Sequence, residues 1–186
     1  MISLMQLWAP IILSGFLVFV GSSLVHMVLK WHNSDYRKLP NEDEVRAAIR
    51  KGNPAPGQYV FPHCVDPKEQ AKPENQQKFV EGPVGLAFIR RNGLPNMGPM
   101  LGQWFGFNLV VSFFTAYVAS RTLAVGTDYL RVFQIAGTVS FVSYAMGSIP
   151  GTIWMGKPWS VALKEMGDGL LYGLLTGGAF GWLWPR

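Results

Sequence analysis

Four regularly spaced glycines near the end of the chain constrain its fold more than any other feature. Gly169, Gly173, Gly177 and Gly181 recur at every fourth position among Leu, Tyr, Phe and Trp residues. At 3.6 residues per turn, this spacing places them on one face of an α-helix. Glycine destabilises a helix in water by about 1 kcal/mol relative to alanine, whereas in a bilayer the helix is enforced and small residues let a second backbone approach closely. The glycine stripe (these four residues) therefore predicts a transmembrane helix with a contact face, a glycine zipper.

The composition agrees with a membrane protein. Of 186 residues, 49% are hydrophobic and only 15% are charged, against a charged share of about 25% in soluble domains. The net charge of +5 does not indicate nucleic-acid binding, because the basic residues lie in one polar stretch and beside apolar runs, as topology signals do. The single cysteine, Cys64, allows no internal disulfide bond.

The apolar runs predict an all-α membrane protein with four transmembrane helices. Each run is long enough to cross a bilayer of about 30 Å. The first carries no basic residue on its N-terminal side, which favours a retained helix over a cleaved signal peptide. We divide the chain into a first transmembrane helix (1–32), a polar extramembrane segment (33–99) and a three-helix transmembrane region (100–186). The predicted spans are residues 8–28, 100–120, 132–153 and 161–184.

The basic residues beside the spans predict the orientation. Seven of them fall on the side of the polar segment and three on the other side. Because positive charge collects on the cytoplasmic side, residues 33–99 are expected in the cytoplasm of a bacterium and both termini outside. The predicted location is the inner membrane, in its cytoplasmic or intracytoplasmic form.

The polar segment, residues 33–99, is predicted to be mostly irregular. It holds nine of the thirteen prolines. A short amphipathic helix should start at Asn41, with Glu44 completing a capping box, and end at Gly52. Residues 58–61 and 84–89 form a candidate β-ribbon around a short helix at 74–80. With so few large apolar residues, this segment is expected to lean on the membrane surface or on a partner protein.

The third span supplies a candidate partner for the glycine stripe. Ser143, Gly147 and Gly151 repeat a small residue at every fourth position, and two such faces can pack closely in a membrane. Asn108 and Gln134 are interpreted as interhelical hydrogen-bond partners rather than as a substrate site.

Three places in the sequence carry candidate chemistry. His26, near the cytoplasmic end of the first span, is a candidate ligand of a pigment or contact of a quinone, or alternatively a headgroup-level histidine. Lys164 and Asp168, one helical turn apart, form either an ion relay or an interfacial salt bridge. His63 and Cys64 offer metal-ligand types in a loop, although a structural zinc site needs more ligands than this loop supplies. Otherwise they belong to an ordinary loop.

The motif search favours a protein that is not an enzyme. The sequence contains no Walker A loop, no GxGxxG after a strand, no HExxH and no GxSxG. No confident cofactor or metal assignment follows, and lipid contacts are expected.

Three stretches carry a resemblance to a known family. They are PGQYVFPHC (56–64), EGPVGLAFIRRNGLPNMG (81–98) and GKPWSVALKEMGDGLLYGLLTGGAFGWLWP (156–185). On these the chain resembles a family of small, uncharacterised bacterial inner-membrane proteins with four transmembrane helices. The resemblance implies the bacterial source and the fold, and it transfers no site residue.

These features predict an accessory or scaffolding subunit, without catalytic activity, of a larger bacterial membrane complex. Respiratory and photosynthetic electron-transfer assemblies are the candidate hosts. The expected partners are other membrane subunits and lipid, contacted through residues 33–99 and the aromatic helix faces. Two alternatives remain: a small transporter or channel component, and a metal- or redox-responsive membrane protein that uses His63 and Cys64.

Overall fold

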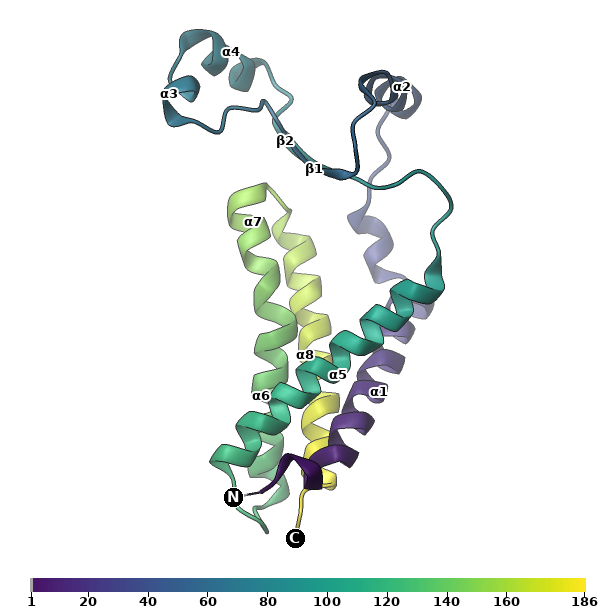
Figure 1. The fold of residues 1–186 in the computed structure, drawn as a ribbon, viewed down its shortest axis with the longest axis vertical. Coiled ribbons are helices and arrows are strands. Elements are labelled where there is room, and N and C mark those ends of the chain that lie inside the picture. Colours follow the sequence, from purple (N-terminus) through teal and green to yellow (C-terminus); the bar gives the residue numbers. More distant parts are fainter. Residues whose placement is uncertain (1) are drawn as a thin grey trace. The chain divides into compact units, whose positions relative to one another are not determined.

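The computed structural model describes residues 2–186, which form two compact units. We call them the helical unit (2–36, 96–153 and 157–186) and the polar unit (37–95 with 154–156). Helix accounts for 71% of the structure, and the only sheet of the described residues has two strands. Figure 1 shows the long helices of the helical unit and the short elements of the polar unit.

The helical unit is built from the apolar runs of the sequence. Its α-helices are α1 (Trp8–Ser23), α5 (Met97–Thr122), α6 (Tyr129–Ala145), α7 (Ile149–Met155) and α8 (Trp159–Trp182). Short 3-10 and π-helical turns continue α1 at both ends and join α6 to α7. The last of these turns, Met146–Ser148, lies two residues before Pro150, which lacks the backbone N–H of a regular helix.

Three of these helical stretches are long and apolar enough to cross a membrane. They are Leu4–Leu29, Met97–Thr122 and Tyr129–Met155, and they contain the first three predicted spans. By length and composition, these three stretches are compatible with a multi-pass membrane protein. Helix α8 is not among these candidate spans; it combines the glycine stripe with three charged residues in its first half.

The glycine stripe packs against α6, as predicted, but against other residues than those predicted. A Cβ added to Gly173 would lie 2.9 Å from the carbonyl oxygen of Gly137, so the two backbones are in direct contact. Gly147, in contrast, has no described atom within 4 Å of the place of its Cβ, and Gly151 would meet only Lys157. The remaining α6 residues that face the stripe are Tyr129, Phe133, Phe141 and Ala145.

The predicted contact face of Ser143, Gly147 and Gly151 is therefore wrong. Ser143 is exposed and donates to the carbonyl oxygen of Val139 in its own helix. The close approach requires shape complementarity between two particular faces, and the face with Gly137 meets the stripe. Spacing alone does not separate one row of small residues from another on the same helix.

The chain termini meet in a hydrophobic cluster at one end of the helical unit. Ile2 and Trp184 are both buried there, and the Trp184 indole Nε1 donates to the Ala124 carbonyl oxygen at 2.9 Å. Figure 1 shows the N- and C-terminal ends close together. Both ends of the chain therefore lie at the same end of the bundle.

The polar unit contains the short elements that the sequence predicted and one further short helix, α3. They are α2 (Glu42–Gly52), β1 (Gly57–Phe61), α3 (Pro67–Gln70), α4 (Pro73–Glu81) and β2 (Gly85–Ile89). Strands β1 and β2 pair antiparallel, with Gly57 opposite Ile89. Asn41 precedes α2, but its side chain makes no cap bond and contacts the Glu44 carboxylate instead, so the capping box is wrong.

Candidate functional site

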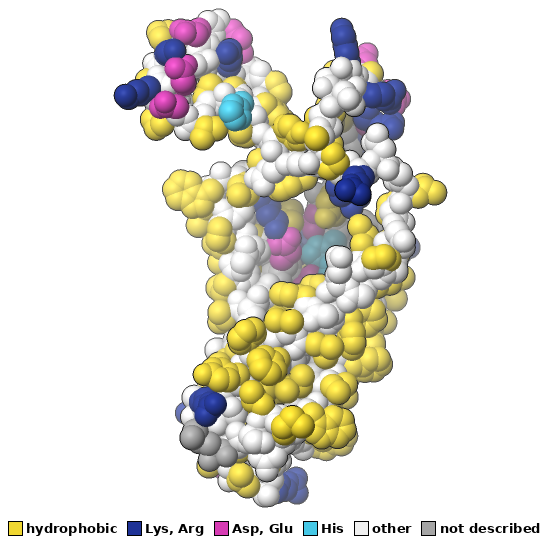
Figure 2. All heavy atoms as spheres, viewed as in Figure 1, with side chains coloured by type: hydrophobic (Ala, Val, Ile, Leu, Met, Phe, Trp, Pro, Cys, Tyr) yellow, Lys and Arg dark blue, Asp and Glu magenta, His cyan; other side chains and the backbone are white. Residues whose placement is uncertain are grey.

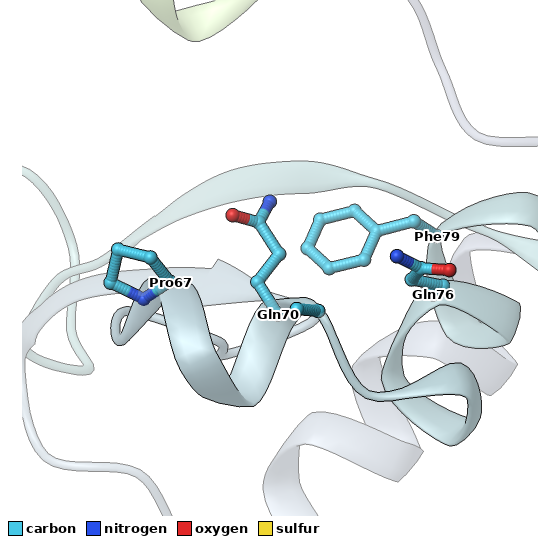
Figure 3. A pocket seen from close by; sticks show the side chains of 5 residues that line it. Pro67, Gln70, Gln76 and Phe79 are labelled. Atoms are coloured by element: carbon cyan, nitrogen blue, oxygen red, sulfur yellow. The ribbon is translucent and has the colours of Figure 1, made fainter.

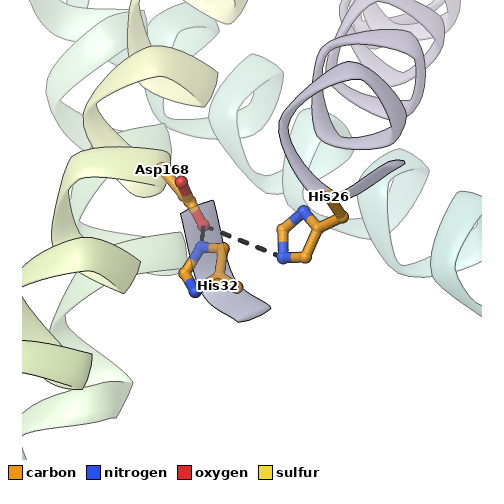
Figure 4. Close-up of side chains that lie close together, drawn as sticks. All are labelled: His26, His32 and Asp168. Atoms are coloured by element: carbon orange, nitrogen blue, oxygen red, sulfur yellow. Dashed lines mark hydrogen bonds and ion pairs between the residues drawn. The ribbon is translucent and has the colours of Figure 1, made fainter. Parts of the chain in front are cut away.

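Two histidines and an aspartate from distant parts of the chain come together in the helical unit. His26, His32 and Asp168 each offer a ligand-type atom, and these atoms all lie within 4.8 Å of one another. Figure 4 shows a nitrogen of each imidazole ring directed toward the same Asp168 carboxylate oxygen. We call these three residues the His–Asp cluster.

An unusual helix end brings the two histidines together. After α1 the chain forms a π-helical turn (Leu24–Leu29), and Lys30 then takes a left-handed backbone conformation with φ of 53°. The chain turns back into a 3-10 helix (Trp31–Asp35). As a result, the rings of His26 and His32 stack, with centroids 4.7 Å apart and planes inclined by 8°. π-Helical turns are frequent at functional sites.

His32 lies between two carboxylates. Its Nδ1 is 2.7 Å from Asp35 Oδ2, and its Nε2 is 2.8 Å from Asp168 Oδ2. The three side chains are almost completely buried, with exposed fractions of 12% for His32, 6% for Asp35 and 7% for Asp168. Because an ionised carboxylate only accepts hydrogen bonds, a proton or another cation must lie on each nitrogen of His32.

Lys164 holds Asp35 from the other side. Its ammonium donates to Asp35 Oδ1 at 2.5 Å, to Ser34 Oγ at 2.8 Å and to the Trp31 carbonyl oxygen at 2.8 Å. The hydrogen bond from Lys164 lowers the pKa of Asp35 below its usual value, and the contact with His32 acts in the same direction. Lys164 thus fixes the 3-10 helix to α8.

Lys164 and Asp168 do not pair with each other, contrary to one interpretation of their spacing. Each pairs with the Trp31–Asp35 segment, Lys164 through Asp35 and Asp168 through His32. The third charged residue of α8, Glu165, pairs with Lys157. Sequence spacing along one helix indicated a local pair, but partners from another segment took both charges.

A cavity of about 420 Å³ opens beside the His–Asp cluster. Its lining combines charged, histidine and aromatic side chains, among them His26, Glu165, Asp168, Tyr144 and Tyr172. Figure 2 shows acidic, basic and histidine side chains inside a hollow, above a surface that is largely hydrophobic. The cluster is therefore accessible to water and small solutes through His26, whose side chain is 50% exposed.

A second, apolar hollow meets the same histidine. It has a volume of about 290 Å³ and is lined by residues of α1, its π-helical end and α5, including Met27, Leu101 and Trp104. His26 and Trp104 line both hollows. The structure thus places His26 where an apolar ligand and the polar cavity would meet, and the pigment or quinone contact stays a prediction.

Two other sequence-predicted residues are not members of this site. His63 and Cys64 belong to the polar unit and are not part of the three-residue His–Asp group. A hollow of about 490 Å³ in that unit lies between α3 and α4; its lining, which includes Pro67, Gln70 and Phe79, carries no charged or metal-ligating side chain (Figure 3).

Of the two predicted hydrogen-bond partners, one forms an interhelical bond. Asn108 of α5 is buried and accepts a hydrogen bond from the Tyr144 hydroxyl of α6 at 3.1 Å. Gln134 is exposed. Further interhelical bonds join Ser14 to Ser112 and Ser140 to Thr176. Such bonds strengthen helix packing in a bilayer by about 0.6 kcal/mol on average.

His32 and Asp35 were not predicted from the sequence as members of the site. His32 is the last residue of the region assigned to the first transmembrane helix, and Asp35 lies in the segment that was expected to be polar and irregular. Two features of the sequence could have indicated them. His32 and Asp35 are three residues apart, which allows contact within one helical turn, and α8 carries one more acidic than basic residue. No protein-family model, curated protein or solved structure matches this chain.

Proposed function

We propose that this protein spans the bacterial inner membrane four times, with α8 as the fourth span. The support comes from the register between α8 and α6. Gly169 packs on Ala145, Gly173 on Gly137, and Gly181 on Tyr129, so α8 runs antiparallel along the whole of α6. A helix of 24 residues is about 36 Å long. Since α6 belongs to a candidate span, its close neighbour crosses the same layer.

The charges of α8 are compatible with this position because each has a partner. Lys164 is paired with Asp35, Glu165 with Lys157, and Asp168 with His32. All three lie in the first half of the helix, on the side of the chain reversal after α1. Charged side chains near a helix end are tolerated at the membrane interface when they are paired.

The orientation places residues 33–99 in the cytoplasm and both termini outside. It is tested with Cys64, the only cysteine of the chain. In sealed spheroplasts, a membrane-impermeant maleimide should leave Cys64 unlabelled, whereas inside-out vesicles should label it. Labelling of intact spheroplasts would contradict this orientation.

We further propose that the protein acts as an accessory subunit, without catalytic activity, of a larger membrane complex. One observation carries this proposal: none of residues 37–95 is buried, although this stretch forms three helices and a ribbon. Several large apolar side chains are almost fully exposed, with Leu94 at 97% and Val80 at 88%. A folded segment with no buried side chain lacks the hydrophobic stabilisation of an independent domain. It therefore needs a partner surface.

The experiment is extraction in mild detergent, native electrophoresis and mass spectrometry of the co-migrating chains. The wild-type protein should migrate with a stoichiometric partner subunit. The variant V80D/L94D should migrate as the free protein, because it places two charges where apolar contacts are proposed. The matched control N92D adds a charge on the same unit without removing an apolar side chain and should stay in the complex. Wild-type protein that migrates alone would contradict the proposal.

A further inference from the structure

We propose that His26, His32 and Asp168 bind one divalent transition-metal ion of the zinc class. This site is independent of the accessory function, which rests on the polar unit. The polar unit contributes none of its three ligands.

The positions of the three ligand atoms fit one small ion. His32 Nε2 is 2.8 Å and His26 Nε2 is 3.9 Å from Asp168 Oδ2. Around a tetrahedral ion with bonds of about 2.0–2.1 Å, neighbouring ligand atoms are roughly 3.3–3.4 Å apart. The two observed separations bracket this value. All three ligand atoms lie within 4.8 Å of one another, so side-chain rotations that open one distance and close the others would bring them onto one ion.

The second ring nitrogen of each histidine already has the partner that metal-binding histidines use. His26 Nδ1 lies 2.9 Å from the carbonyl oxygen of Ser22, which can only accept, so this nitrogen carries the proton. His32 Nδ1 faces the carboxylate of Asp35 at 2.7 Å. Such partners fix the ring orientation and leave Nε2 with a free lone pair for a metal. Lys164 in turn holds Asp35 in place.

A cation between these atoms removes an electrostatic conflict. With Nδ1 protonated on both rings, three electron-pair donors point toward one region, and two of them belong to side chains that are at most 12% exposed. In addition, Asp168 Oδ1 is buried and has no hydrogen-bond partner among the described residues. A buried carboxylate oxygen without a partner is unfavourable because it has lost its hydration. An ion bound by both carboxylate oxygens of Asp168 would supply this missing interaction.

The ligand set and the adjoining cavity define the class of ion. Two imidazole nitrogens and one carboxylate oxygen suit zinc, iron(II) and cobalt(II), whereas calcium and magnesium prefer oxygen ligands only. The cavity of about 420 Å³ beside His26 and Asp168 leaves room for water as a fourth ligand. The competing occupant is a proton on each Nε2.

The test uses the full-length protein in detergent, stripped with a chelator and titrated with zinc chloride by calorimetry. Bound zinc after dialysis is counted by elemental analysis. The expected result is about one zinc per chain. H26Q, H32Q and D168N should each lower the affinity at least roughly tenfold, and D35N should lower it roughly tenfold to hundredfold through His32.

The matched control is H63Q, which removes a histidine of the polar unit and should bind zinc like the wild type. H26Q guards against misfolding, because His26 is half exposed; its unfolding temperature without zinc should equal that of the wild type. The proposal is overturned if the stripped wild-type protein binds no zinc, which would leave protons on the cluster. It is equally overturned if H63Q weakens binding as much as H26Q and H32Q do.

Discussion

Replacing Gly173 with alanine should weaken the packing of α8 against α6. The new Cβ would lie 2.9 Å from the Gly137 carbonyl oxygen, 3.1 Å from Phe141 Cβ and 3.3 Å from the Phe141 backbone nitrogen. Ordinary contacts begin at 3.4 Å. Two of these three atoms belong to the backbone, so no side chain can rotate away from the first clash. The helices must therefore separate by about half an ångström at this point.

The expected loss of unfolding free energy follows from this separation of the helices. A gap of about 0.5–1 Å removes roughly a quarter to a half of the dispersion energy of each contact. Overpacking typically destabilises a protein by about 1–3 kcal/mol. Alanine also favours helix over glycine by up to about 1 kcal/mol in water. The free energy of unfolding of G173A should therefore fall by about 1–2 kcal/mol.

The matched controls are alanine substitutions at glycines with free space. Gly106 of α5 and Gly147 have no described atom within 4 Å of the place of a Cβ. G106A and G147A should leave the stability unchanged or raise it slightly. The assay is reversible unfolding in mixed micelles with increasing sodium dodecyl sulfate, followed by circular dichroism. The packing argument is refuted if G173A is as stable as G106A. If G147A alone lost stability, the result would instead support Ser143, Gly147 and Gly151 as the face that contacts the stripe.

Three further outcomes are expected. The hydrogen bond from Lys164 lowers the pKa of Asp35, so the ionised Asp35 stabilises the folded protein above the unfolded-state pKa of about 3.9, and this stabilisation is lost as the pH falls through the lower folded-state pKa. D35N should therefore flatten the fall of the unfolding temperature at acid pH. An unchanged pH profile would contradict this prediction. K164M should speed hydrogen exchange in Trp31–Asp35, measured by mass spectrometry, and wild-type protection there would argue against the tether. Y144F should lower the unfolding free energy by about 0.5–1.5 kcal/mol, because buried Asn108 loses its hydrogen bond; equal stability would exclude a net contribution.

The local elements could be predicted from the sequence because their signals are local. Apolar runs predicted the first three candidate spans, and the turn residues around two short apolar runs predicted the strands β1 and β2. The helix of residues 42–52 ends at Gly52, as its pattern predicts. Each of these signals depends on residues a few positions apart, so no knowledge of the tertiary contacts is needed.

The candidate site was only half visible in the sequence. His26 and Asp168 were singled out as separate features, and Lys164 was assigned to the wrong partner. What joins them is the left-handed turn at Lys30, which returns the chain so that His32 stacks on His26 and contacts Asp168. This backbone reversal is stabilised by the contacts it creates. One of them, between His32 and Asp168, joins residues that are 136 positions apart in the chain.

The sequence by itself determined that this chain forms membrane-length helices and that α8 carries a face for close packing. Periodicity and hydropathy are properties of the chain, and they hold whatever the helix meets. Only the tertiary structure decided that Gly137, not Gly147, faces the stripe, and that Asp168 meets two histidines. Which faces and charges meet depends on the register between helices, and this register is set by shape and charge complementarity over the whole interface.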